Sequence, residues 1–138
     1  MTIVGWSVAN STAGNREVRK ERRSEVDACC KLAADLLAKV RAYYTKGADH
    51  EDSSRLGREV VFDLHRLLQR VERLGKNCPK FEVVGVLGEL HEAITGGEFD
   101  SSTRKALQHD APEILNIEYW THALMNGMED GFADTFRS

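Results

Sequence analysis

The chain has 138 residues, 41% apolar and 30% charged, which is long enough for one folded domain and too apolar for wholesale disorder. Its formal net charge of −3 excludes a generally basic nucleic-acid binder. The charge is divided unevenly, because residues 1–80 hold sixteen Lys and Arg against eleven Asp and Glu, whereas residues 81–138 hold three against eleven. A basic first part and an acidic second part can guide their own packing or attract oppositely charged partners.

The first fourteen residues show no hydrophobic periodicity and end in the turn-rich stretch NSTAGN. We expect an irregular lead over residues 1–14 and a single helical domain over residues 15–138. The opening MTIVGWSVA is too short for a membrane span and lacks the basic start of a signal peptide. We therefore expect no membrane span.

A long helix is predicted from about residue 15 to 46. Apolar residues between Val26 and Tyr44 recur at steps of three and four, and Gly47 follows as a stop signal. Cys29 and Cys30 fall on this apolar stripe, and Cys78 lies far along the chain. This spacing gives neither a disulfide framework nor a CxxC metal motif, which indicates reduced core thiols in a cytoplasmic protein.

A second helix is predicted from Ser53 or Ser54 to Leu74, with Gly75 as its end. Its apolar residues form a regular seam at steps of four and three: Leu56, Val60, Leu64, Leu67, Val71 and Leu74. Two long helices joined by the short segment GADHEDS predict an antiparallel αα-hairpin.

The segment 81–95, after Pro79, has helical apolar spacing, although its FEVVGVL stretch is also β-prone. A helix is favoured here, and a strand stays open as the alternative. A short helix is then predicted from Ser101 or Ser102 through His109.

The last predicted helix begins with Asp110 as its cap and Pro112 in its first turn. It either ends at Gly127 or continues, because Met128, Phe132 and Phe136 keep the helical spacing. If it continues, small residues form a ridge that allows close approach of another helix: Ala123, Gly127 and Gly131. The fold predicted by the whole pattern is an all-α bundle of four or five helices, led by the long antiparallel hairpin.

Two charged segments are candidate partner-binding sites. The basic arm comprises Arg16, Arg19, Lys20, Arg22 and Arg23, and the acidic tail comprises Glu129, Asp130, Phe132, Asp134 and Phe136. Exposed cations on the arm suit an acidic protein surface, and aromatic rings flanked by carboxylates suit a basic partner. Nucleic-acid binding through the arm is an alternative, which the interleaved glutamates disfavour by repelling phosphates.

The hexapeptide RKALQH places Arg104 and His109 with four residues between them. This spacing resembles the RxxxxH motif of HEPN ribonucleases, which are small helical proteins that often dimerise and cleave RNA. The resemblance implies that Arg104 stabilises phosphate charge and that His109 takes part in proton transfer at the 2′-OH. A HEPN-like ribonuclease is thus the enzymatic alternative.

No other pattern fixes a reaction. The Glu-x-x-His motif of di-metal helical bundles does not occur, nor does a GxSxG elbow or a Gly-rich phosphate loop. The sequence therefore favours a non-enzymatic interaction protein, an adaptor, inhibitor or regulatory subunit, without cofactor or metal. The surplus length of the first helix and the complementary charges also favour a homodimer.

Overall fold

The computed structural model describes the backbone of residues 2–77 and 83–136, and the side chains of residues 14–76 and 83–136. Within these residues the chain forms four α-helices and no strand: α1 Thr2–Thr45, α2 Ser53–Asn77, α3 Val84–Thr95 and α4 Pro112–Thr135. The predicted all-α helical bundle is therefore confirmed.

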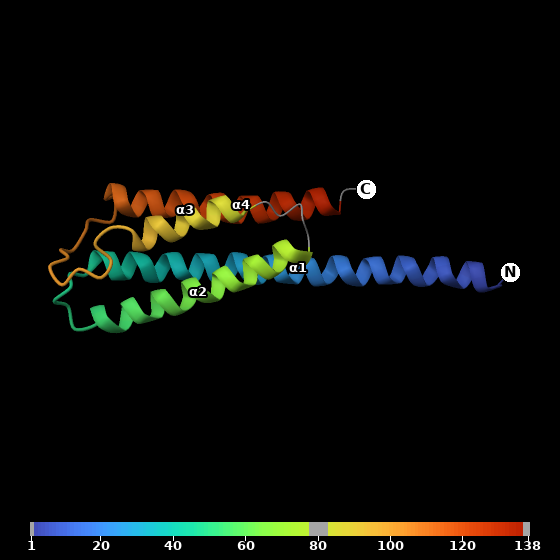
Figure 1. Cartoon of the computed structure of the whole chain (residues 1–138), viewed down its shortest axis with the longest axis horizontal. Coiled ribbons are helices and arrows are strands. Elements are labelled where there is room, and N and C mark those ends of the chain that lie inside the picture. Colours follow the sequence, from blue (N-terminus) through green and yellow to red (C-terminus); the bar gives the residue numbers. More distant parts are fainter. Residues whose placement is uncertain (1, 78–82, 137–138) are drawn as a thin grey trace.

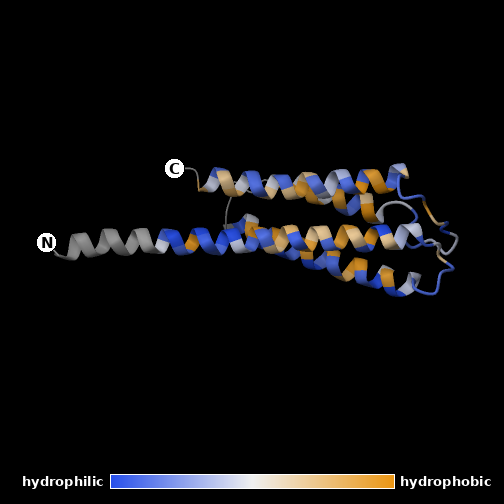
Figure 2. Ribbon diagram, turned by 180° about the vertical axis from the view of Figure 1, so that it is seen from behind, coloured by the Kyte–Doolittle hydropathy of each residue, from blue (hydrophilic) through white to orange (hydrophobic). Residues whose placement is uncertain are grey.

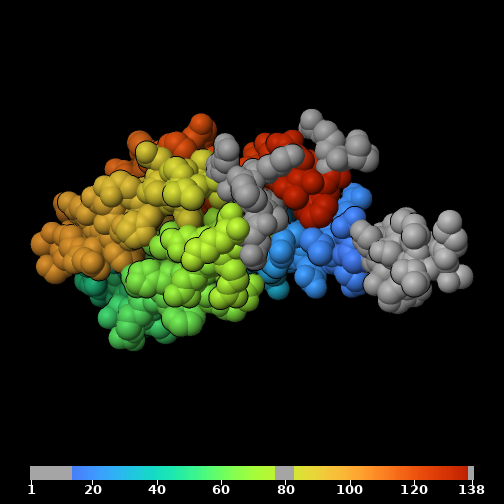
Figure 3. Space-filling view, turned by 45° about the vertical axis from the view of Figure 1, so that its right-hand side comes forward, coloured from blue at the N-terminus to red at the C-terminus, as the bar shows by residue number. Residues whose placement is uncertain are grey.

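The helices run alternately up and down along one long axis. In Figure 1, α2 runs back along α1, α3 runs parallel to α1, and α4 returns beside it. α1 packs against both α2 and α4, and α3 packs mainly against α4. Figure 3 shows α2 and α3 side by side on one face of the molecule. The basic part of the chain thus supplies one helix pair, α1 and α2, and the acidic part supplies the other.

The core lies between the two pairs, and Figure 2 shows apolar residues on the faces that the helices turn toward one another. The periodic stripe of α1 is buried from Val26 to Tyr44, and the whole predicted seam of α2 is buried. The inner face of α3 is formed by the buried side chains of Leu87, Leu90 and Ile94. Burial of such residues, at roughly 25 cal/mol per Å² of apolar surface, is the main source of stability in a bundle of this kind.

Three helix boundaries differ from the sequence expectations. α1 begins at Thr2, so the irregular lead predicted for residues 1–14 is wrong over residues 2–14. No proline interrupts this stretch, and residues such as Gly14 cost only about 1 kcal/mol each inside a helix. α2 likewise continues through Gly75 to Asn77. α4 begins after Ala111, so the cap predicted at Asp110 is wrong, while Pro112 does occupy the first turn.

The segment 96–111 is a loop, and the short helix predicted from Ser101 or Ser102 through His109 is wrong. Its backbone makes isolated turn bonds, such as that from the Arg104 amide to the Ser101 carbonyl at 3.3 Å, and also pairs with the end of α1 and the turn that follows it. The Ala48 amide donates to the Arg104 carbonyl at 2.9 Å, and the Leu107 amide donates to the Tyr44 carbonyl at 2.8 Å. Tertiary pairing has replaced the local hydrogen bonds that a helix would need.

The two alternatives left open by the sequence are settled. Residues Val84–Thr95 form a helix, and Phe81 lies outside the described residues. The helical spacing of apolar residues in 81–95 also includes Val84, but its side chain is 73% exposed. α4 continues through Gly127 to Thr135, with Met128 and Gly131 buried.

Candidate interaction surfaces

The first turns of the basic arm stand apart from the bundle. α1 continues well beyond the last turn of α4, as Figure 1 shows. Every residue from 14 to 21 is exposed, including Arg16, Arg19 and Lys20, and the first buried side chain that the structure describes in α1 is Val26. No ion pair of these three cations occurs within the part of the chain that the structure describes.

The last part of the arm contacts the acidic tail. Arg23 forms ion pairs with Asp27 and with Glu129 of α4, each at 2.5 Å. Its guanidinium also lies 4.8 Å from the centre of the Phe132 ring. The hydrogen bond from Arg23 holds the pKa of Glu129 below its ordinary value of 4.5. Arg22 is half-buried and pairs with Glu25 at 2.8 Å.

The rest of the tail is divided between core and solvent. Phe132 is half-buried against the core, and its ring lies 5.0 Å from that of Phe136, which is also half-buried. Asp130 and Asp134 are exposed. The structure therefore brings Arg23 together with Glu129 and Phe132. The cations nearer the start of α1, Arg16, Arg19 and Lys20, lie apart from this contact and are exposed.

Arg104 is the most unusual charged residue of the molecule, because it is only 5% exposed. Its guanidinium donates to the carbonyl oxygens of Tyr43 at 2.9 Å and Lys46 at 2.5 Å, and to the Ser53 hydroxyl at 2.5 Å. It also lies over the Tyr43 ring, 3.9 Å from its centre. A cation at this position satisfies the last carbonyls of α1 and complements the helix dipole.

The two residues of the RxxxxH pattern differ in their surroundings. Arg104 and His109 lie in the 96–111 loop and not on a helix, and His109 is exposed while Arg104 is buried. The Arg104 guanidinium is already occupied by the end of α1 and the start of α2. It has no carboxylate partner within the described residues, and its Nε atom has no hydrogen-bond acceptor there.

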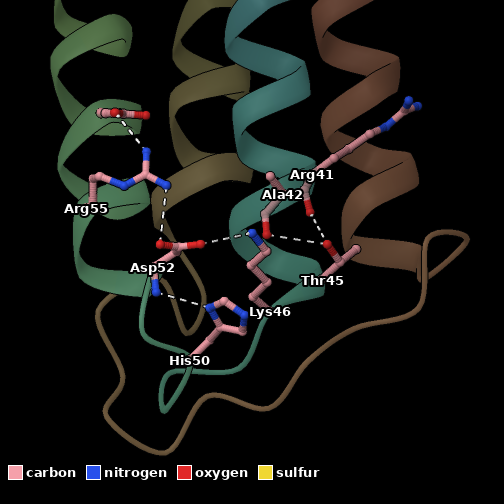
Figure 4. A network of polar contacts seen from close by, with 8 residues as sticks. Arg41, Ala42, Thr45, Lys46, His50, Asp52 and Arg55 are labelled. Atoms are coloured by element: carbon pink, nitrogen blue, oxygen red, sulfur yellow. Dashed lines mark hydrogen bonds and ion pairs between the residues drawn. The ribbon is translucent and has the colours of Figure 1, made fainter.

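A polar network fixes the neighbouring turn between α1 and α2, as Figure 4 shows. Asp52 lies within 3.6 Å of the Lys46 ammonium and 3.4 Å of the Arg55 guanidinium. The Asp52 amide donates to Nδ1 of His50 at 3.0 Å. These contacts, together with Arg104, define how the first turn of α2 faces the 96–111 loop.

A cleft of about 620 Å³ lies between the first half of α2 and the 96–111 loop. Tyr43 and Phe99 contribute to its lining from the core side, and Arg58 and Phe62 contribute from α2. Phe62 is 68% exposed. Phe62 was not among the residues predicted to be functional from the sequence. Its signal was that Val61 and Phe62 form an apolar pair outside the regular seam of α2.

Other site classes find little support in the described residues. Residues 2–77 and 83–136 hold no group of three or more His, Cys, Asp or Glu side chains that could bind a metal ion. In the same residues no helix is long and apolar enough to cross a membrane. Burial raises the pKa of Cys30 to about 11 and raises that of Cys29, so neither thiol is activated. Cys78 lies outside the described residues.

Comparisons with known proteins find no relative. No family model matches the chain, and searches of the curated proteins and of the solved structures also give no match.

Proposed function

We propose that this protein is a non-enzymatic interaction protein, whose basic arm docks on an acidic surface of a partner protein. The observation that carries the proposal is the stretch 14–21 of α1, in which every side chain is exposed although the helix continues. Isolated helices of about a dozen residues are marginal in water. A partner packed against this stretch would supply the missing stabilisation.

Charge supports an acidic protein partner. Arg16, Arg19 and Lys20 project from adjacent turns, whereas Glu17 and Glu21 form a separate ridge. Matched opposite charges across an interface raise the association rate and exclude wrong partners. The two glutamates would oppose a phosphate backbone, so nucleic acid remains the less favoured partner.

The test is a charge reversal at the exposed part of the arm. The variant carries Arg16→Glu, Arg19→Glu and Lys20→Glu, and the matched control carries Arg66→Glu, Arg73→Glu and Lys76→Glu on the exposed face of α2. Proteins captured by each form from lysate of the source cells are quantified by mass spectrometry. We expect an acidic protein that is captured by the unaltered chain and the control and is at least tenfold depleted with the arm variant. Equal capture by all three forms would contradict the proposal.

The alternatives have their own outcomes. Binding of a 30-nucleotide RNA or DNA that weakens steeply between 50 and 200 mM salt would favour a nucleic-acid partner instead. RNA cleavage that His109→Ala abolishes would favour the HEPN-like ribonuclease, which no contact of the buried Arg104 supports.

The homodimer and the cytoplasmic location stay proposals. The overhang of α1 leaves a surface that a second copy of the α1–α2 hairpin could cover. Sedimentation equilibrium distinguishes a 15.5 kDa monomer from a particle of twice that mass. A monomeric mass at high micromolar concentration would exclude the dimer.

A further inference from the structure

The cleft beside α2 is a second candidate surface, remote from the exposed part of the arm. It lies where the 46–52 and 96–111 loops meet the start of α2, at the opposite end of the molecule from the overhang of α1. The Tyr43 ring lies close to the backbone of α2 at this point. A Cβ atom added to Gly57 would lie only 3.1 Å from Cε2 of the Tyr43 ring. A glycine at this position therefore allows the aromatic wall of the cleft to lie close to α2.

One side of the cleft is apolar and open to solvent. Phe62 and Val61 are 68% and 37% exposed, and both line the cleft beside the buried Phe99. Phe62 is the most exposed phenylalanine among the described residues. A single exposed apolar residue is ordinary, but an adjacent pair at the edge of a cleft is typical of a binding site for an apolar side chain.

The same wall of the cleft also carries a cation. Arg58 is exposed on α2 one turn before Phe62, and Arg104 reaches the lining from the buried side. Asp100 is the one carboxylate among the residues that line this cleft. Neutral acceptors hold the Arg104 guanidinium in place, without a carboxylate partner among the described residues. The cleft therefore combines an exposed apolar pair with one formal positive charge in excess, Arg58 and Arg104 against Asp100.

We propose that this cleft binds a short segment of a partner protein in which a large apolar side chain is flanked by carboxylates. The apolar side chain packs on Phe62 and Val61, and the carboxylates face Arg58, which is the exposed cation of the cleft. Ser101 and Ser102 of the loop offer hydroxyl donors at the same cleft. The proposal is independent of the arm, because the two surfaces share no residue.

The test uses a library of random twelve-residue peptides displayed on phage and selected on the full chain. We expect the enriched peptides to share an aromatic or large aliphatic residue next to Asp or Glu. A fluorescein-labelled copy of the most enriched peptide is then titrated by fluorescence polarisation. Phe62→Ser and Arg58→Ser should each weaken its binding at least tenfold, because each removes one of the two features of the cleft.

Tyr119→Ser is the matched control, since Tyr119 is a 64% exposed aromatic residue on α4, away from the cleft. It should change the affinity less than twofold, and circular dichroism should show the same thermal unfolding for all three variants. Selection without an acidic apolar consensus, or equal binding by Phe62→Ser, would overturn the proposal. A dimer of the chain that Phe62→Ser converts to a monomer would also overturn it, by making a second copy the occupant.

Discussion

At the scale of single residues, Arg104 shows how a charged side chain can serve the fold. The sequence allowed a catalytic interpretation of this residue, because an Arg and a His at this spacing resemble a nuclease motif. In the structure, its guanidinium instead joins the last carbonyls of α1 to Ser53 in the first turn of α2. No local signal distinguishes the two roles, since burial of Arg104 depends on how its own loop packs against the distant end of α1.

Replacing Arg104 by alanine should therefore reduce stability strongly. The change leaves two carbonyl oxygens and a hydroxyl without their donor, and we expect the free energy of unfolding to fall by about 3 kcal/mol. Urea unfolding followed by circular dichroism measures it. Lys105→Ala, at the exposed neighbouring position, is the control and should change stability by less than about 0.5 kcal/mol. If Arg104→Ala lowered the free energy of unfolding by less than about 0.5 kcal/mol, the buried contacts of Arg104 would not stabilise the bundle.

At the scale of helices, Gly127 lies in the interior of α4, where Val83, the residue before α3, approaches it closely. Glycine commonly marks the end of a helix, and Gly127 was one of two predicted ends. In the structure α4 passes through it, and a Cβ atom at Gly127 would lie 2.7 Å from Cγ1 of Val83. The small residue permits the residue before α3 to approach α4, which agrees with the small-residue ridge expected for a continuing helix.

Gly127→Ala tests this contact, because two effects oppose each other. Alanine favours the helix by about 1 kcal/mol, but Val83 is buried and stiff at χ1, and overpacking there should cost about 2 kcal/mol. We expect a net loss of about 1 kcal/mol on thermal or urea unfolding. In a Val83→Ala background the same substitution should become neutral or stabilising. A stabilising effect in the unaltered chain would show that Val83 does not press on Gly127.

At the scale of the whole molecule, the charge division along the sequence becomes a division between two helix pairs. Some of these charges join the pairs, since Arg23 binds Glu129 and Arg41 binds Glu118, both between α1 and α4. Others remain at the surface, including the cations at the free end of α1. Charge complementarity thus contributes to internal packing, while the cations at the free end of α1 stay exposed.

The contact between Arg23 and Glu129 predicts a pH dependence of stability. The pKa of Glu129 is lowered by the hydrogen bond from Arg23, so the stabilisation is present above the ordinary value of 4.5 and is lost as the pH falls through the lower value of the folded state. Because Glu129 is 48% exposed, solvent limits the contribution to less than about 1 kcal/mol.

Urea unfolding of the unaltered chain and Glu129→Gln between pH 7 and pH 3 measures this contribution. The variant should be less stable at pH 7, and the difference should disappear toward pH 3. Asp130→Asn is the matched control at the neighbouring exposed position and should show no such difference. A gap that persists undiminished at pH 3 would rule out the ion pair as its cause.

The sequence by itself determined the all-helical class and the buried stripes of α1 and α2, because apolar periodicity is a local property that burial then uses directly. It favoured a helix over residues 81–95, and the structure decided between that helix and a strand. The sequence also determined the charge division. Only the tertiary structure decided that residues 101–109 form a loop, that Arg104 is buried and that Phe62 borders a cleft. The loop and the burial of Arg104 depend on hydrogen bonds between residues 51 to 63 positions apart, and the cleft depends on how α2 meets the 96–111 loop. Such contacts leave no periodic trace in the segments that make them.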